Sequence, residues 1–474
     1  MKFNKHKSIE YLFKSLALPG LKRYILILAS GITLIVFGVL WLFDKHPVYR
    51  IIKFLRELLY DTSNFLPNNV NGIIAITVGG VIVVYASVKF IQHLLGAYFP
   101  EGRESIPEVL YKKRYLDRAP KVVVVGGGTG LSNLLRGLKR YTNNITAIVT
   151  VGDDGGSSGR LRTELGVLPP GDIRNCITAL ADEDKLVTEL FRYRFESGEG
   201  LEGHSFGNLF ITALCAVTHG DMLEAVRTAS RVLNSRGQVL PATLDTLTLK
   251  AEFTDGTMVV GESNITSAGK RISRLSLLPA EPAAVSEALT AIMQAELIVL
   301  GPGSLFTSII PNLLIPEIAE AIRNSPAAKI YVCNVSTQPG ETTDFSVGDH
   351  VQAILTHTGG LTTESGKLIN AVLVNDLNPP QAVLEKLARA NVRMVKYDQE
   401  RLREFGIDVI RRPLTSEGSA SHHDPLKLAR ILMMWFFRYT RRRAKTVKPV
   451  SFSFSEKKVV VKKEPAEVIS SRKS

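Results

Sequence analysis

Residues 121–138 read KVVVVGGGTGLSNLLRGL, and this stretch decides the fold of most of the 474-residue chain. A short β-branched run, Lys121 to Val125, is followed by a turn and then by apolar residues at helical spacing from Leu131 to Leu138. Strand, glycine turn and helix predict the opening unit of a nucleotide-binding α/β sheet. The turn brings backbone amides and the positive end of a helix dipole to one point, where a phosphate fits, and it consists of Gly126, Gly127, Gly128, Thr129 and Gly130.

The spacing of this turn departs from the GxGxxG pattern of dinucleotide-binding proteins. Leu131 stands where the last glycine would be, and no Walker-type lysine follows. Plain dinucleotide binding and ATP hydrolysis are therefore poorly supported. A tight packing turn without a ligand is the alternative.

A second strand, Ile145 to Val151, runs into a loop of glycines, carboxylates and hydroxyls that ends at Arg160. Such a loop buries little and loses much entropy on folding, which a binding site tolerates. We expect Asp153 and Asp154 to hold a hard cation such as Mg²⁺ or to bond sugar hydroxyls, and Arg160 to pair with phosphate. The alternative is a solvated turn.

Further loops carry more candidate ligand residues. Asp172 and Asn175 follow a Pro-Pro-Gly segment, where Asp172 is either a helix N-cap or a ligand contact. His204 opens another helix and is favoured as a structural residue, because no carboxylate partner can be assigned to it. The remaining predicted contacts come from a loop near residue 235 and from a second glycine turn after a strand at 297–300, and they are Asn234, Arg236, Gln238, Gly301, Gly303 and Ser304.

The pattern of strands predicts an α/β domain over 121–424, with a Rossmann-like, mostly parallel sheet and one insertion. An antiparallel pair, Thr246 to Phe253 and Met258 to Gly261, interrupts the β/α alternation and is expected to cover a site. Two glycine turns at strand ends of one sheet predict two halves of one ligand cleft. Further strands are predicted at Ile330 to Asn334, Val351 to Thr356, Ala371 to Asn375 and Val392 to Tyr397.

Residues 1–99 are predicted to form a membrane region with two transmembrane helices. The uncharged run 24–43 is long enough to cross about 30 Å of hydrocarbon, and 72–95 is a second apolar segment. Basic residues before the first segment and after the second place both ends in the cytoplasm. A signal peptide for the first and a buried helix or strand for the second are the alternatives. We therefore expect a cell-membrane protein whose ligand-binding domain is cytoplasmic and follows a linker at 100–120.

The net charge of +13 is distributed unevenly along the chain. Residues 121–424 carry a net charge of −6, whereas 1–120 carry +8 and 425–474 carry +11. An acidic folded domain is a poor binder of nucleic acid, so the basic flanks indicate an anionic membrane surface instead. The tail, 425–474, is predicted to be a basic amphipathic helix, docked on the membrane or on the domain, and then disordered chain. The three cysteines, without CxxC spacing, predict free thiols in a reducing compartment.

Five segments in order resemble the bacterial gluconeogenesis factor family, which is related to the 2-phospho-L-lactate transferases; they are 126–130, 152–162, 170–175, 234–241 and 301–308. The resemblance implies a Rossmann-like core, binding of a UDP-sugar, and a role in cell shape and peptidoglycan precursor control during gluconeogenic growth. It places Asp153 and Asp154 near a diphosphate or cation, Gly301 to Ser304 near phosphate, and Asn234 to Gln238 near the nucleotide. The membrane hairpin lies outside the part that resembles the family.

Two classes of function follow. In the first, the domain is a regulatory protein that senses a nucleotide sugar such as UDP-N-acetylglucosamine, acts on envelope-synthesis or regulatory proteins, and forms a homo-oligomer. In the second, it is a Mg²⁺-dependent transferase of a phospholactyl-type group. The sequence favours the first, because no convincing general base can be identified.

Overall fold

The computed structural model describes residues 21–43, 68–98, 115–182, 185–363, 366–377, 379–416 and 421–446. The chain divides into two compact units, 1–114 and 115–474. Most of the predicted linker, and the predicted disordered tail from 447 onward, lie outside the described residues.

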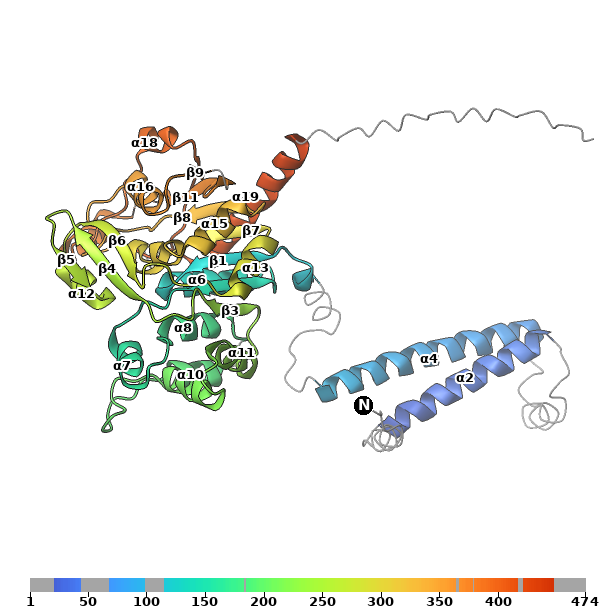
Figure 1. The fold of residues 1–474 in the computed structure, drawn as a ribbon. Coiled ribbons are helices and arrows are strands. Elements are labelled where there is room, and N and C mark those ends of the chain that lie inside the picture. Colours follow the sequence, from blue (N-terminus) through green and yellow to red (C-terminus); the bar gives the residue numbers. More distant parts are fainter. Residues whose placement is uncertain are drawn as a thin grey trace, which may run out of the picture. The chain divides into compact units, whose positions relative to one another are not determined.

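The first unit is a pair of helices, α2 (Leu21–Phe43) and α4 (Asn68–Tyr98), that pack against each other in opposite directions (Figure 1). Glycines seven residues apart line the contact. A methyl group at Gly79 would lie 2.9 Å from the Gly31 carbonyl oxygen, and one at Gly38 would lie 3.0 Å from the Gly72 carbonyl oxygen. The two backbones therefore approach as closely as small residues allow, as in helix pairs that associate in lipid.

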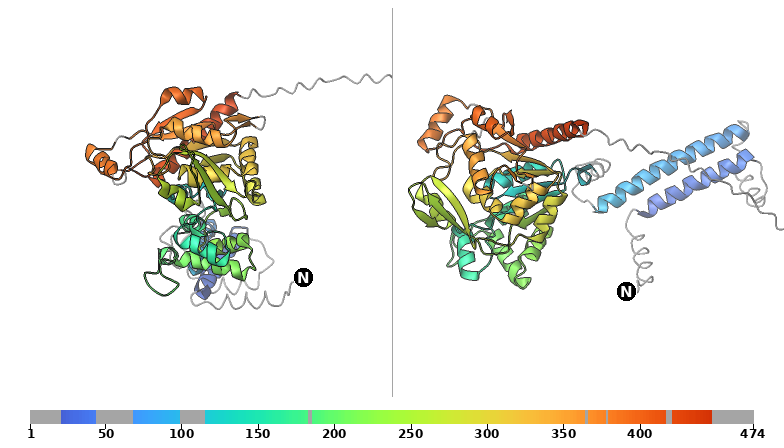
Figure 2. Two further views of the ribbon diagram at one scale, coloured as in Figure 1. Left: turned by 60° about the vertical axis from the view of Figure 1, so that its left-hand side comes forward. Right: turned by 45° about the horizontal axis from the view of Figure 1, so that its top comes forward.

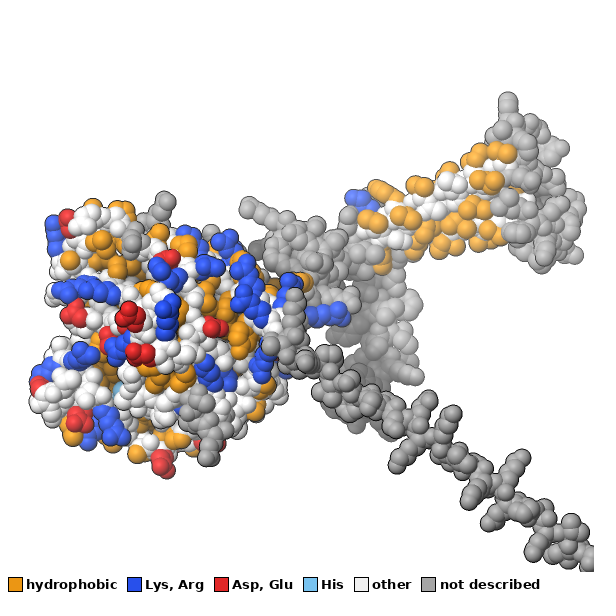
Figure 3. Space-filling view, turned by 90° about the horizontal axis from the view of Figure 1, so that it is seen from above, with side chains coloured by type: hydrophobic (Ala, Val, Ile, Leu, Met, Phe, Trp, Pro, Cys, Tyr) orange, Lys and Arg blue, Asp and Glu red, His pale blue; other side chains and the backbone are white. Residues whose placement is uncertain are grey.

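By length and composition, one helix in the described residues is suited to cross a membrane, over Gly72–Phe90 within α4. Helix α2 contains a shorter apolar stretch, Leu26–Val39. Of the two predicted spans, the described residues therefore support one as a candidate by these criteria, the one over 72–95, and not the one over 24–43. The visible side chains of this helix pair are nearly all hydrophobic (Figure 3).

The second unit is built on a seven-stranded sheet whose strands all run parallel, in the order β12-β11-β8-β7-β1-β2-β3. The predicted α/β fold with a mostly parallel sheet is thus confirmed. Strands β1, β2, β7 and β8 are buried along their whole length, which explains their runs of Val and Ile without polar alternation. The strands are β1 (Val122–Gly126), β2 (Ile145–Val149), β3 (Gln238–Pro241), β7 (Leu297–Leu300), β8 (Ala328–Val332), β11 (Ala371–Asn375) and β12 (Asp408–Arg412).

Helices cover both faces of this sheet (Figures 1 and 2). Helices α6, α8 and α19 pack together, and α13 packs on α15. The helices are α6 (Gly128–Leu138), α7 (Gly156–Leu165), α8 (Gly171–Leu180), α9 (Lys185–Arg192), α10 (Phe206–Val217), α11 (Met222–Val232), α12 (Glu262–Ala268), α13 (Ser286–Gln294), the π-helical turn η2 (Leu305–Ile309), α14 (Ile310–Leu313), α15 (Pro316–Asn324), α16 (Val347–His357), α17 (Gln381–Arg389), α18 (Gln399–Glu404) and α19 (Pro425–Thr446).

The predicted antiparallel insertion is present and contains one strand more than expected. Strand β4 (Thr248–Phe253) pairs with β5 (Met258–Val260) on one side and with β6 (Ile272–Leu278) on the other. A separate two-stranded ribbon consists of β9 (Thr362–Thr363) and β10 (Gly366–Lys367).

Two predicted strands are wrong. Val351 to Thr356 lies inside helix α16, which begins with a capping box in which Ser346 and Asp349 each bond the other's backbone amide. Val392 to Tyr397 makes only isolated bridges to Ser336 and Ser346. The last strand of the sheet is β12 instead, which the sequence pattern missed.

The predicted C-terminal helix is present as α19, and its apolar side is buried in the domain. Leu428, Ala429, Leu432, Met433 and Phe436 are all less than 5% exposed, at the spacing of one helix face. Gly137 in α6 gives α19 the room that it needs, since a methyl group there would lie 2.8 Å from Ala429 Cβ. The apolar face is therefore part of the domain core.

Candidate functional site

The centre of the sheet is a topological switch point. From β1 the chain order proceeds through β2 to β3 in one direction, and from β7 it proceeds through β8 to β12 in the other. Ligands of open α/β sheets bind in the crevice at the carboxyl ends of the strands on either side of such a point. Both predicted glycine turns lie there, because one follows β1 and the other follows β7.

The two glycine turns touch each other. A methyl group at Gly130 would lie 2.7 Å from the carbonyl oxygen of Pro302, and one at Gly303 would lie 3.1 Å from the carbonyl oxygen of Gly127. Gly126 ends β1 and Gly301 directly follows β7, and the side-chain amide of Asn312 donates to the Gly126 carbonyl oxygen at 3.1 Å. The predicted two halves of one cleft are thus adjacent.

One backbone amide in the first turn is already bonded within the protein. Gly128, with φ of +66°, donates its N–H to Oδ2 of Asp172 at 2.7 Å. The amides of Thr129 and Gly130 begin helix α6, and first-turn amides have no acceptor inside their own helix. An anion at this turn would therefore meet Thr129 and Gly130 rather than Gly128.

Asp172 lies between the glycine turn and the next loop, in the first turn of α8. Its side chain does not cap α8 but accepts from Gly128. Burial raises the pKa of Asp172 to about 6; the Gly128 amide opposes this shift, and the charge of Asp153 adds to it. Of the two roles predicted for Asp172, the N-cap is therefore wrong.

A cavity of about 280 Å³ opens beside the two turns. Its lining also contains residues that no sequence pattern groups with the turns. Gln338 donates to Oγ of Ser304 at 2.6 Å, and Asn334 donates to Oε1 of Gln338 at 3.0 Å. The lining residues are Gly127, Gly128, Thr129, Gly130, Asn133, Pro302, Gly303, Ser304, Ser308, Asn334, Val335, Ser336, Gln338, Ser421, His422 and His423.

His422 and His423 are two further histidines at this site that the sequence analysis did not single out. Both line the cavity, although they lie more than a hundred residues beyond the turns in the sequence. Burial lowers the pKa of His423 to about 4, so its ring is neutral at pH 7. Its Nε2 is buried without a hydrogen-bond partner among the described residues. It is therefore a candidate ligand contact, whereas so low a pKa makes it a weak base.

A second, smaller cavity of about 170 Å³ is lined in part by Asp172. The first turns of α7 and α8 both line it. Inside, Ser157 Oγ lies 3.0 Å from His204 Nδ1 and accepts from the Asn208 amide at 3.0 Å. Burial lowers the pKa of His204. The lining residues are Asp153, Gly155, Gly156, Ser157, Ser158, Gly171, Asp172, Arg174, Asn175, Arg194 and Asn208.

Asp153 and Asp154, the two predicted cation ligands, accept hydrogen bonds from different residues. Asp153 Oδ1 accepts from the Gly155 amide at 2.9 Å, whereas Asp154 Oδ1 accepts from the amide and hydroxyl of Ser263 at 2.9 and 2.7 Å. In the described residues no three Asp, Glu, His or Cys side chains are grouped as a metal site. A hard cation here would need phosphate oxygens of a ligand for most of its coordination, as Mg²⁺ commonly does.

Two carboxylates near this loop have raised pKa values, mainly because they are buried. Burial, followed by the charges of Asp153 and Asp172, raises the pKa of Glu262 to about 9. Burial also raises the pKa of Glu341, which lies beside Thr307, to about 7. Such shifts are typical of functional sites.

Arg160 and Asn175 are both bonded within the protein. Arg160 donates to the Glu202 carbonyl oxygen at 2.6 Å and lines neither cavity. Asn175 lines the smaller cavity and accepts from Arg174 at 2.7 Å.

Three predicted contacts lie at the wrong end of the sheet. Gln238 starts β3 and donates to Thr146, near the start of β2, at 2.8 Å. Asn234 and Arg236 bond Asp182 instead of facing a cavity. Parallel strands of five residues separate their amino and carboxyl ends by about 13 Å, so these side chains do not reach the cleft.

The α/β domain is similar to known proteins. The sequence profile of the family described as 2-phospho-L-lactate transferase CofD matches residues 122–415. Gluconeogenesis factor of Bacillus subtilis is 47% identical over 319 residues, which are 67% of this chain and 98% of that protein. A Nostoc sp. protein, provisionally named a gluconeogenesis factor, is 46% identical over 422 residues, which are 88% of this chain and 91% of its own.

The fold has also been seen in a solved structure. The crystal structure of a Bacillus halodurans protein is 45% identical and superposes with a TM-score of 0.63, covering 67% of this chain and 100% of that protein. Family profile, relatives and structure agree over the α/β domain. The chain therefore belongs to the CofD family, whose profile is that of 2-phospho-L-lactate transferase, as a homologue of the gluconeogenesis factors.

Proposed function

We propose that the α/β domain binds a nucleotide sugar of the UDP-N-acetylglucosamine type and thereby regulates cell shape and envelope-precursor synthesis during gluconeogenic growth. The observation that carries the proposal is the contact between two glycine turns at the switch point of the sheet, where Gly130 meets Pro302 beside an open cavity. The names of the relatives support the gluconeogenic part.

The diphosphate would lie at the amides of Thr129 and Gly130 and at the second turn, near Ser304. Two features support this placement. The first turn of α6 offers unpaired amides and the positive end of a helix dipole. The hydroxyl of Ser304 is held in place by Gln338 at 2.6 Å. His423 and Asn334 then face the rest of the ligand.

We further propose that α2 and α4 form a membrane hairpin that holds the domain at the cytoplasmic side of the cell membrane. The close glycine contacts between the two helices support a pair that stays together in lipid. A sensor of envelope precursors would act there on envelope-synthesis or regulatory proteins, and as a homo-oligomer. These partners follow from the proposed role.

A second candidate function is a Mg²⁺-dependent transferase of a phospholactyl-type group. The observation that favours it is the carboxylate cluster beside the smaller cavity, where Glu262 has a pKa of about 9. A cation bound there together with a phosphorylated ligand would neutralise part of this charge. Asp153 and Asp172 line that cavity and are the side chains that would contact such a cation.

Calorimetry on residues 115–446 decides between the two. UDP-N-acetylglucosamine, UDP, NAD and GDP are titrated with and without Mg²⁺, and product formation is followed in the same samples. Micromolar binding of the UDP-sugar without turnover establishes the sensor, whereas a guanine nucleotide that requires Mg²⁺ indicates the transferase. If the double variant Asp153→Ala with Asp154→Ala binds the ligand as well as the unchanged domain does, neither residue is part of the binding site.

A further inference from the structure

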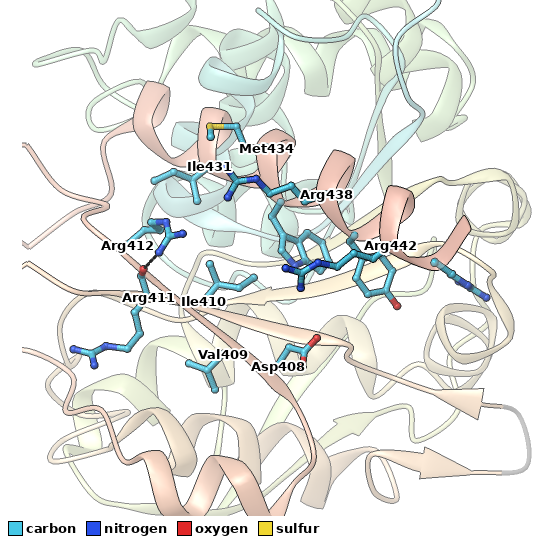
Figure 4. Close-up of a pocket in the computed structure, with 12 residues that line it drawn as sticks. Asp408, Val409, Ile410, Arg411, Arg412, Ile431, Met434, Arg438 and Arg442 are labelled. Atoms are coloured by element: carbon cyan, nitrogen blue, oxygen red, sulfur yellow. Dashed lines mark hydrogen bonds between the residues drawn. The ribbon is translucent and has the colours of Figure 1, made fainter. Parts of the chain in front are cut away.

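A groove of about 480 Å³ lies between strand β12 and helix α19 of the same domain. It shares no lining residue with the two cavities described above. Figure 4 shows Ile410 and Arg412 of the strand on the side of the helix, opposite Ile431, Met434, Arg438 and Arg442. Strand β12 pairs only with β11, so this groove is at one edge of the sheet.

The lining of this arginine groove is cationic and apolar. It contains five arginines and a single carboxylate. Trp435 and Tyr439 stack with ring centroids 5.1 Å apart, and Met434 is 47% exposed. Figure 3 shows basic and hydrophobic side chains interspersed over the face that carries α19. The groove is lined by Asp408, Val409, Ile410, Arg411, Arg412, Ile431, Met434, Trp435, Arg438, Tyr439, Arg442 and Arg443.

Two of these arginines leave their positive charge unbalanced. Arg411 pairs with Asp376 and lies over the Tyr397 ring at 4.6 Å. In contrast, Arg412 donates to a backbone carbonyl, and Arg438 makes no ion pair with a carboxylate in the described part of the chain. A groove with free guanidinium charge and an apolar wall matches an amphiphile with an anionic head.

The chain itself makes a lipid surface the occupant that the observations favour. Sixteen residues separate α4, which contains the candidate span Gly72–Phe90, from the domain. Fully extended they reach about 55 Å, so a membrane that holds α4 is always within reach of the domain. Trp and Tyr beside arginine are also the side chains that gather at membrane interfaces.

We propose that the arginine groove binds the phosphate headgroup of an anionic phospholipid, with Arg412 and Arg438 on the phosphate and Trp435 against the acyl region. The helix does not insert, because its apolar face is buried in the domain core. The groove therefore seats one lipid at a time on a folded surface. This inference is independent of the nucleotide site.

The test uses residues 115–446, which correspond to a domain that a relative of known structure forms without the helix pair. Trp435 is then the only tryptophan, because the other is Trp41. Vesicles of phosphatidylcholine are compared with vesicles containing about one-third phosphatidylglycerol. We expect sedimentation only with the anionic vesicles, and quenching of Trp435 fluorescence when the phosphatidylglycerol carries brominated chains.

The groove variant is Arg412→Gln with Arg438→Gln, and the matched control is Arg389→Gln with Arg403→Gln, two exposed arginines on α17 and α18. The groove variant should lose about fivefold in vesicle affinity for each arginine, roughly 25-fold in all, and the control less than twofold. Circular dichroism checks that both variants are folded.

Several results would overturn the proposal. Equal losses in both variants would mean that net charge alone attracts the domain. Absence of binding to anionic vesicles, or equal binding to phosphatidylcholine, would exclude the lipid. If the domain binds polyglutamate but not vesicles, and the groove variant loses that binding, the groove binds an acidic protein segment instead.

Discussion

The backbone amide of Gly128 donates a 2.7 Å hydrogen bond to Oδ2 of Asp172, which lies 44 residues further along the chain. This bond ties the glycine turn after β1 to the first turn of α8. It also links the two cavities of the site, because Gly128 lines the larger one and Asp172 lines the smaller one. The turn is thus held in position by a charged group before any ligand arrives.

The pKa of Asp172 predicts how stability depends on pH. The pKa of Asp172 is about 6 in the folded domain, and the reference value for the unfolded chain is 3.8. Between these two pH values the folded form binds more protons than the unfolded form, so the free energy of unfolding falls as the pH rises. From pH 5 to pH 7 this carboxyl should reduce the free energy of unfolding by about 1.3 kcal/mol.

Asp172→Asn should remove that share of the pH dependence. It should also make the domain more stable at pH 7, because the buried charge is gone while the amide oxygen still accepts from Gly128. Urea unfolding at pH 5 and pH 7 measures both effects. The control is Glu320→Gln, which removes an exposed carboxylate. An unchanged pH dependence in Asp172→Asn would show that the group is not raised in pKa.

Gly130→Ala should separate the two glycine turns. The added methyl group would lie 2.7 Å from the Pro302 carbonyl oxygen, so the backbone must shift, at a cost of about 1–3 kcal/mol in unfolding free energy. Gly126→Ala is the control in the same turn, because its nearest contact would be an ordinary 3.8 Å. Urea unfolding of the two variants should differ; equal stabilities would contradict the close contact.

Gln338→Ala should weaken ligand binding with little change in stability. The substitution leaves the Ser304 hydroxyl without the amide that positions it at 2.6 Å. A hydrogen bond of this kind contributes about 1 kcal/mol, so affinity should fall about fivefold. Calorimetry with the UDP-sugar measures the loss, and Gln352→Ala on the exposed side of α16 should leave affinity unchanged.

The helix pair allows a test with two neighbouring glycines. Gly79→Ile would place side-chain atoms against Ile35 and the Gly31 carbonyl oxygen, where even a methyl group comes within 2.9 Å. Gly80→Ile meets nothing within 4 Å at its first carbon. Hydrogen exchange of α2 in detergent micelles should speed up in the first variant alone. The same protection in both variants would mean that α2 and α4 do not pack through these glycines.

The sequence was informative where structure is determined locally. The Val122–Gly126 strand and its glycine turn were predictable, because a buried parallel strand and a phosphate-type turn each have a short-range signature. The apolar run at Val351 to Thr356 was misread as a strand, since four to eight apolar residues do not distinguish a buried strand from a helix. Ser346 and Asp349, three residues apart, were the available helix signal.

The site was predictable only in part, because a cleft is made by segments that are distant in sequence. Gly303 and Ser304 were found with the first turn, since both turns end strands of one sheet. His423 and Gln338 were not, because no local pattern says which loop returns to the cavity. Asn234 and Arg236 were misplaced, since Gln238–Pro241 was not predicted as a strand of the main sheet and the loop before a strand lies at its amino end.

The packing of α19 on α6 affects how the protein is made. Helix α6 follows the first strand of the domain, yet its surface at Gly137 is closed by Ala429, almost three hundred residues later. A chain emerging from the ribosome therefore cannot complete this core until α19 has been synthesised. The apolar segment Gly72–Phe90 emerges long before that point, so delivery to a membrane would precede closure of the domain.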